Sequence, residues 1–313
     1  MDADRRFEDL TAPHRRELLA HCYRMSGSLH DAEDLVQETL LRAWRAYPTY
    51  DPARASMRTW LYRIATNACL TALKGRQRRP LPTTLVPPLE DPQAPMEYGT
   101  EVPWLQPFPT DPADVAVRRG SLRLAFIAAV QLLPARQRAI LILRDVLDWS
   151  AAEVAGALGT TATAVNSGLA RARARLGVAG LREDDVGEPA AARDRAVVDE
   201  YVDAFQRADL GALRRLLVDD AILEMPPVLN WYTGRDAYIR FIARSFASRG
   251  IDWQMLPIDA NGQPAAAAYV RAGDGRYHAH TLQVFAIAGG GVQHTVVFQE
   301  PSLFAAFGQP LIR

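Results

Sequence analysis

Apolar residues between positions 31 and 45 recur at every third or fourth position. The segment reads DAEDLVQETLLRAWR, and this spacing predicts an amphipathic helix. Its opposite face carries Asp34, Gln37 and Glu38. Acidic residues in the first turn and arginines in the last turn also suit the helix dipole.

A second helical pattern covers residues 57–76 and leaves a cationic polar face. Its polar positions are Arg58, Arg63, Asn67 and Lys74. The pattern ends in the run KGRQRR, residues 74–79, which adds Arg76, Arg78 and Arg79. Cations at the end of a helix complement its dipole, and they equally suit a phosphate backbone. Both readings stay open, and nucleic-acid contact is the one we favour.

Two short helices joined by a glycine turn are predicted between residues 150 and 176. Ser150 and Glu153 have the spacing of a capping box, and Gly159 is placed to end the first helix. Thr161 or Thr163 caps the second. A helix-turn-helix of this kind places the start of its second helix in a major groove. A purely structural helical hairpin is the alternative.

The residues at the start of this second helix are those placed for base contacts: Thr161, Thr163, Ala164, Asn166 and Ser167. Further along it come Arg171, Arg173 and Arg175, which are better placed for phosphates.

Proline separates the two helical regions. Residues 80–112 contain ten prolines, too many for a helix or a central strand. At about 3.1 Å per residue, a polyproline linker of this length reaches ~100 Å. This reach is enough for the two helical regions to occupy DNA grooves one to two helical turns apart, a separation of ~35–70 Å. The segment Trp104–Phe108 is too aromatic for a plain spacer, so it is either a docking segment or a loop packed on its own domain.

The last third of the chain mixes helix and strand. After an acidic, alanine-rich linker at 179–194, helical spacing covers residues 195–217 and 234–246. Strands are predicted at 221–225, 251–258, 265–271, 277–287 and 292–299, with glycine turns between the later ones. We expect an α+β domain at 195–313 with a curved antiparallel sheet.

Composition and charge narrow the classes of function. The 313 residues suggest two or three domains. No apolar run approaches the ~20 residues of a membrane span, and residues 1–10 lack the apolar core of a secretory signal, so we expect a cytoplasmic protein. Net charge is zero, but residues 1–180 hold 23 Lys and Arg against 19 Asp and Glu, and residues 181–313 hold 13 against 17. The N-terminal half is therefore the basic one.

Cys22 and Cys69 are the two cysteines, and both lie in helical patterns. Neither belongs to a CxxC motif or a His/Cys cluster, so we expect buried thiols, no zinc site and no cofactor.

The two helical regions together resemble the extracytoplasmic-function sigma factors of the sigma-70 family. The resemblance is carried by DAEDLVQETLLRAW and MRTWLYRIATNACLTAL, followed by LPARQRAILILR, AAEVAGALGTTATAVNS and RARARL in the same order. It implies a multidomain fold with two all-α sigma domains: region 2 at residues 1–79 and the helix-turn-helix of region 4 at 113–178.

The same resemblance implies roles for these residues. Asp34, Gln37 and Glu38 would dock on the clamp helices of core RNA polymerase. In the −10 element Asn67 would contact a base, and the backbone would be held by Arg58, Arg63, Lys74, Arg76, Arg78 and Arg79. The −35 element would be read by Thr161, Thr163, Asn166 and Ser167, with Arg171, Arg173 and Arg175 on phosphates. Asn166 and Gly168 depart from the common pattern of a cation and a larger polar residue, although Asn can pair bidentately with adenine.

The C-terminal domain resembles the SnoaL-like cone of the nuclear-transport-factor-2-like superfamily, on the stretch MPPVLNWYTGRDAYIRFI. Enzymatic relatives use an Asp, His or Glu inside the cone for proton transfer. No acid lies between Asp274 and Glu300. We therefore expect no catalytic residue, and a regulatory domain whose candidate ligand pocket comprises Trp231, Tyr232, Trp253, His280, Gln283 and Phe298.

The first hypothesis is a transcription initiation factor that binds core RNA polymerase and promoter DNA and is controlled by its own C-terminal domain. Control would operate through docking of that domain and of Trp104–Phe108 on the sigma domains. A SnoaL-type enzyme carried on a DNA-binding module and a ligand-gated repressor are the alternatives.

Overall fold

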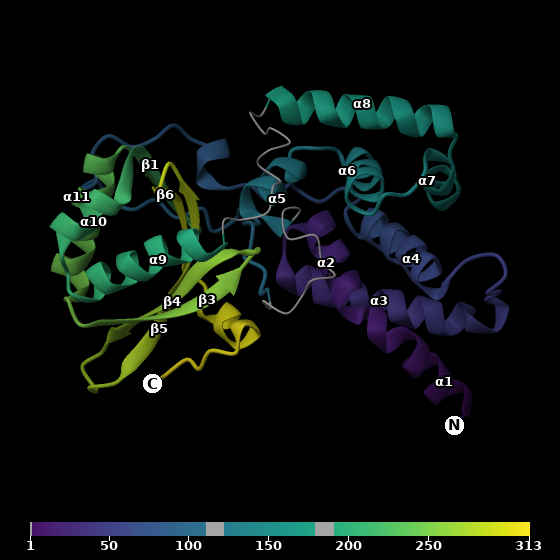
Figure 1. The fold of residues 1–313 in the computed structure, drawn as a ribbon, viewed down its shortest axis with the longest axis horizontal. Helices are drawn as coiled ribbons and strands as arrows, with labels where there is room; N and C mark the ends of the chain where they lie inside the picture. Colours follow the sequence, from purple (N-terminus) through teal and green to yellow (C-terminus); the bar gives the residue numbers. More distant parts are fainter. Residues whose placement is uncertain (1, 111–121, 179–190) are drawn as a thin grey trace. The chain divides into compact units, whose positions relative to one another are not determined.

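The chain forms two compact units (Figure 1). A computed structural model describes residues 2–110, 122–178 and 191–313. The helical unit comprises residues 1–79 and 115–187, and the cone unit comprises 80–114 and 188–313. The proline-rich segment predicted as a linker therefore belongs to the cone unit. We call its residues 80–110 the strap.

The first part of the helical unit contains α1 (Asp2–Thr11), α2 (Arg15–Ser26), α3 (Leu29–Ala46) and α4 (Met57–Ala72). Short-range chemistry fixes the ends of these helices. Ser28 caps α3 by accepting a hydrogen bond from the Asp31 N–H, and Ser56 caps α4 by accepting one from the Thr59 N–H. Helix α4 ends four residues before the predicted Arg76, and Gly75 follows with a positive φ of 78°.

The second part contains α5 (Leu124–Gln131), α6 (Ala135–Leu141), a π-helical turn at Ile142–Val146, α7 (Ala151–Leu158) and α8 (Ala162–Val178). Helices α7 and α8 form the predicted helix-turn-helix. The Ser150–Glu153 capping box is present, and Gly159 ends α7 in the left-handed region at φ 58°. The Thr161 hydroxyl accepts a hydrogen bond from the Ala164 N–H, so Thr161 rather than Thr163 caps α8.

Gly168 allows α8 to lie close to α6. A Cβ atom at this position would come within 2.7 Å of Ile140 Cδ1. A larger residue would displace the Ile140 side chain, which gives a packing reason for the glycine that departs from the common family pattern.

The helices of the cone unit are α9 (Ala191–Gln206), α10 (Leu210–Leu216) and α11 (Arg235–Arg249). The single helix predicted at 195–217 is in fact two helices and the start of a strand. Ala208 breaks it with a φ of 51°, and the Asp209 side chain caps α10 by accepting a hydrogen bond from the Ala212 N–H.

The sheet has six strands in the order β2-β1-β6-β5-β4-β3. The strands are β1 (Leu217–Met225), β2 (Val228–Thr233), β3 (Trp253–Ala260), β4 (Gln263–Arg271), β5 (Tyr277–Ala288) and β6 (Gly291–Phe298). The prediction of an antiparallel sheet is corrected in one respect: β1 and β6 run parallel, so the sheet is mixed. Strand β2 was not predicted. It is short and begins directly after Pro226 and Pro227.

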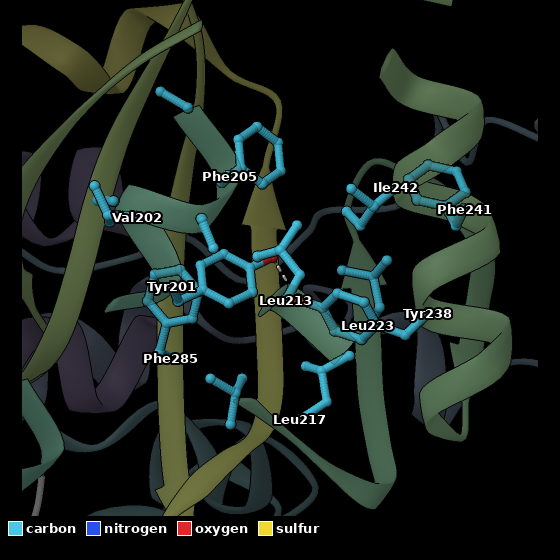
Figure 2. Packing of buried hydrophobic residues seen from close by; sticks show 14 of the residues in the cluster. Tyr201, Val202, Phe205, Leu213, Leu217, Leu223, Tyr238, Phe241, Ile242 and Phe285 are labelled. Atoms are coloured by element: carbon cyan, nitrogen blue, oxygen red, sulfur yellow. Dashed lines mark hydrogen bonds between the residues drawn. The ribbon is translucent and has the colours of Figure 1, made fainter. Parts of the chain in front are cut away.

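The core of the cone unit lies between the sheet and its helices. Figure 2 shows Tyr201 and Phe205 of α9 on one side and Tyr238, Phe241 and Ile242 of α11 on the other. The Tyr201 and Tyr238 hydroxyls lie 2.9 Å apart, and Tyr238 donates to Thr295 Oγ1 at 2.8 Å. Burial raises the pKa of Tyr238 to about 12, so this polar chain stays neutral inside the apolar core.

Candidate polymerase, promoter and ligand sites

One face of α3 presents polar and apolar side chains together. Asp34 and Gln37 are exposed, and half-buried Glu38 accepts a hydrogen bond from Arg42 Nε at 2.6 Å. On the same helix Leu41 and Trp44 are 51% and 38% exposed. Large apolar side chains left open beside charged ones are typical of protein interfaces, so this face has the composition of a docking surface.

The cations around α4 fall into two classes. Arg58 Nε pairs with Glu17 Oε2 at 2.7 Å, and its guanidinium lies 4.9 Å from the centre of the Tyr62 ring. Arg76 and Arg79 both pair with Asp31, at 3.2 and 2.8 Å.

The remaining cations of this face are Arg63, Lys74 and Arg78. Each is exposed, and none forms an ion pair within the part of the chain that the structure describes. These three side chains are therefore the ones most open to a phosphate backbone.

Asn67 does not point into solvent alone. Its side-chain amide donates to the Arg63 carbonyl oxygen at 2.9 Å and to the Ala157 carbonyl oxygen of α7 at 3.3 Å. The predicted −10 base contact is thus engaged with the first helix of the helix-turn-helix.

A buried polar cluster also joins the two parts of the helical unit. Arg138 of α6 is 4% exposed and donates to the Met25 carbonyl oxygen at the end of α2. It donates as well to Gln131 Oε1 at 2.5 Å, and Gln131 Nε2 donates to the Arg24 carbonyl oxygen at 3.4 Å. Burial lowers the pKa of Arg138 to about 10, so the guanidinium remains charged and depends on these acceptors.

The outward face of α8 is open. Thr161, Thr163, Asn166 and Ser167 are exposed, and the buried residues Val165, Leu169 and Ala172 hold the helix against its unit. Arg171 and Arg175 are exposed. Arg173 differs, because it makes two hydrogen bonds to the Asp145 carboxylate, at 2.9 and 3.1 Å.

The strap is fastened to the cone unit near its end. The Phe108 N–H donates to Asn261 Oδ1 at 2.9 Å, and the Asn261 N–H returns a bond to the Phe108 carbonyl oxygen at 2.8 Å. Leu105 is fully buried. Of the two readings of Trp104–Phe108, the structure shows packing on the cone unit.

The middle of the strap is held by β2 and α11. Asn230 accepts a hydrogen bond from the Glu97 N–H at 2.7 Å and donates to the Pro95 carbonyl oxygen at 3.1 Å. Arg244 donates to the carbonyl oxygens of Pro92 and Ala94, at 2.7 and 2.6 Å. These bonds use backbone atoms of the strap, so they fix its path rather than one side chain.

The beginning of the strap is hydrogen-bonded to a buried acid. Glu224 is fully buried; its Oε2 accepts from the Thr83 N–H at 2.8 Å, and its Oε1 lies 2.6 Å from His294 Nε2. Neighbouring Leu223 and Met225 line the cavity inside the cone. Because side chains alternate along a strand, Glu224 and its histidine lie on the outer side of the sheet, under the strap.

The cavity has a volume of about 60 Å³. Trp253, His280 and Gln283 line it, together with Met96 of the strap. Burial and then the charge of Arg249 lower the pKa of His280 to about 4, so the imidazole is neutral at pH 7.

Comparisons with known proteins agree with this architecture. A Sigma-70 region 2 model matches residues 10–79, a Sigma-70 region 4 model matches 123–176, and a SnoaL-like domain model matches 198–295. The chain is 49% identical to the ECF RNA polymerase sigma factor SigG of Mycobacterium tuberculosis, over 98% of this chain and 86% of that protein. This chain belongs to the extracytoplasmic-function sigma factors.

The ECF sigma factor SigJ of M. tuberculosis is a second relative, 28% identical over 73% of this chain and 69% of its own. The crystal structure of M. tuberculosis SigJ shares the fold of this chain, with a TM-score of 0.66 at 23% identity, and the match covers 95% of this chain and 97% of SigJ. Like its family, this sigma factor directs promoter-specific transcription initiation. Among its described residues, no helix combines the length and apolarity needed to cross a bilayer.

Three of the six predicted pocket residues of this sigma factor lie elsewhere. Trp231 donates its indole N–H to the Val86 carbonyl oxygen of the strap at 2.8 Å. Tyr232 stacks on Phe241 in the core with ring centres 5.1 Å apart, and buried Phe298 is also outside the cavity lining.

Sequence reasoning missed the residues that hold the strap, chiefly Glu224, Asn230 and Asn261. An acid within the apolar strand predicted at 221–225 and the Asn261–Gly262 pair were the available signals. The strap partners of all three residues lie more than 130 residues away in the chain. It also missed Arg138, which the helical pattern of residues 133–144 leaves as one polar position among several.

Proposed function

We propose that this sigma factor docks on core RNA polymerase through α3, contacts the −10 element through α4 and reads the −35 element through α8, and that its SnoaL-like domain restrains initiation by holding the strap. The polymerase contacts are Asp34, Gln37 and Glu38. The observation that carries the regulatory part is the series of backbone hydrogen bonds from Thr83 to Phe108 that fastens the strap to the cone unit.

Promoter geometry explains why this fastening restrains initiation. Two elements one to two helical turns apart are separated by ~35–70 Å. A segment joining regions 2 and 4 must extend to span that distance. While the strap lies on the cone, its residues are not available for such an extension, so polymerase and the cone compete for the same segment.

Contacts inside the helical unit also oppose initiation. Asn67 contacts Ala157, and Arg138 bonds to Met25, so regions 2 and 4 touch each other. They cannot stay in contact while reading two separate elements. The closed arrangement is therefore the resting state of the protein, and binding to polymerase opens it.

We also propose that the SnoaL-like domain acts by binding rather than by catalysis. The described residues that line the cavity include no carboxylate, and His280 is a weak base because of its depressed pKa. The buried Glu224–His294 pair lies on the outer side of the sheet and bonds to the strap. Its contacts support a structural role for Glu224, whereas an enzyme would need an acid or base inside the cone.

Run-off transcription tests the proposal. Fragmented genomic DNA and purified core polymerase are combined with the full chain, with a chain ending at Gly187, or with Asn261→Ala, which removes the side-chain acceptor for Phe108. Shared start sites with increased output from both altered proteins are expected. Gln293→Ala, an exposed position on β6, is the matched control and leaves output unchanged.

Unchanged output from both altered proteins would refute the regulatory role. Absence of initiation by every version, together with specific DNA binding without polymerase, would favour the repressor alternative. Turnover of a polyketide-like substrate that depends on His280 would favour the enzyme.

A further inference from the structure

The cavity of the SnoaL-like domain has an uneven lining. Its apolar part includes Phe205, Phe241 and Trp253, and the Trp253 and His280 rings lie 5.3 Å apart. Its polar part consists of Ser245, Arg249, His280, Thr281, Gln283 and Gln299. Every one of these six side chains can donate a hydrogen bond, and none is a carboxylate.

The charge at this lining is positive. Arg249 is exposed at the end of α11, where the helix dipole favours a cation. No ion pair with Arg249 is formed within residues 2–110, 122–178 and 191–313. His280 stays neutral and offers one N–H, so the polar part of the lining has donors and one net positive charge.

We propose that the cavity binds a small amphipathic anion, such as an aromatic or short aliphatic carboxylate. The carboxylate lies at Arg249 and His280, and the apolar part lies against Phe205, Phe241 and Trp253. This assignment rests on the proposed regulatory function and names the class of ligand that the domain senses.

The size of the cavity links this ligand to the strap. A dry cavity of ~150 Å³ holds one benzene molecule, whereas this one measures about 60 Å³. A ring-sized ligand therefore enters only if a lining side chain moves. Met96 is the lining residue contributed by the strap, and it lies between Pro95 and Glu97, the two residues bonded to Asn230.

Displacing Met96 strains the bonds that hold the middle of the strap. Ligand binding and strap release are then coupled: the anion favours the released strap, and a released strap binds the anion more tightly. The ligand is thereby an inducer of initiation.

Calorimetry on the full chain with 2-naphthoate and with its neutral counterpart 2-naphthalenemethanol tests the site. The acid is expected to bind more tightly than the alcohol. Arg249→Gln should weaken the acid roughly tenfold or more and leave the alcohol unchanged, because only the acid makes a charge-assisted hydrogen bond. Arg276→Gln, in the β4–β5 turn, is the control and should change neither affinity.

Met96→Ala enlarges the cavity and should strengthen binding of both compounds. The strap contains no Lys or Arg but does contain Glu90, Glu97 and Glu101. Cleavage there by a glutamate-specific protease should accelerate when 2-naphthoate is added, and not in the Arg249→Gln protein. No binding of either compound at millimolar concentration, or equal loss of both in Arg249→Gln, overturns the assignment.

Transcription separates this inference from the function on which it rests. If Asn261→Ala raises run-off output but 2-naphthoate does not bind, the strap regulates and the ligand class is wrong. If 2-naphthoate binds through Arg249 but neither it nor Asn261→Ala changes output, the site exists and the regulatory role is wrong.

Discussion

The Asn67 side chain of α4 donates a hydrogen bond to the Ala157 carbonyl oxygen of α7 across 3.3 Å. Ala157 belongs to the first helix of the helix-turn-helix, so the residue assigned to a −10 base faces the domain assigned to the −35 element. A base that accepts a hydrogen bond from the Asn67 side-chain NH₂ would have to take the place of the Ala157 carbonyl oxygen. Promoter reading by Asn67 therefore requires the two regions to separate.

Removing the Arg138 side chain should favour that separation. Arg138→Met deletes the bonds to Met25, Gln131 and Leu133, and buried acceptors left without donors cost ~1–3 kcal/mol. Small-angle scattering should show a larger radius of gyration, and binding to core polymerase should become tighter.

Arg136→Met is the matched control for this change. Arg136 lies on the same helix but donates to the Leu158 carbonyl oxygen within region 4. It should lower stability without changing the radius of gyration. Equal polymerase affinity in wild type and Arg138→Met would mean that the buried cluster does not hold the closed state.

The division of cations around α4 predicts two kinds of mutant. Arg63→Ala and Arg78→Ala remove exposed cations, so each should weaken promoter binding of the holoenzyme uniformly and reduce the salt slope by about 1. Arg58→Ala should instead reduce the stability of the helical unit, because Arg58 already pairs with Glu17 and Tyr62. Promoter affinities measured between about 50 and 200 mM salt distinguish the two kinds of mutant, because the salt slope counts the phosphate contacts. A full unit of slope lost in Arg58→Ala would place that side chain on DNA.

The outward face of α8 predicts a difference between Asn166 and Arg171. Asn166→Ala should relax base preference at one −35 position by roughly 1–3 kcal/mol, because a base contact is lost. Arg171→Ala should weaken all −35 sequences alike, since a phosphate carries no sequence information. Selection of initiation sites from a randomised −35 library measures both. Identical sequence preference in wild type and Asn166→Ala would exclude Asn166 from base contact.

How much of this the sequence predicts depends on the range of the interactions. The helix-turn-helix was predictable because its signals are local: Ser150 with Glu153, then Gly159 and Thr161. The strap was not, because its prolines are typical of a free spacer and its anchors, such as Asn261 for Phe108, are far away in sequence. Trp231 was misplaced for a related reason. Because β2 was not recognised, the face of the sheet on which Trp231 lies could not be predicted. The structure shows that its indole N–H bonds to the strap and not to the cavity.

Buried His21 predicts how the stability of the helical unit depends on pH. Its Nε2 lies 3.0 Å from Thr66 Oγ1, and its Nδ1 has no hydrogen-bond partner among the described residues. Burial, and then the charges of Arg24 and Arg58, lower the pKa of His21 from 6.5 to about 3. Between these two values the unfolded chain binds a proton that the folded chain does not. The stabilisation is thus present above pH 6.5 and is lost as the pH falls toward 3.

At 1.36 kcal/mol per pH unit, the helical unit should lose about 2 kcal/mol between pH 6.5 and pH 5 through this group. Hydrogen exchange of peptides from α2 and α4, corrected for intrinsic rates, measures the loss. His21→Gln cannot titrate, so its exchange should lack this part of the pH dependence. His278→Gln, at a partly exposed position on β5 of the cone unit, should behave as wild type. An identical pH dependence in wild type and His21→Gln would show that His21 is already protonated, or already solvated, in the folded protein.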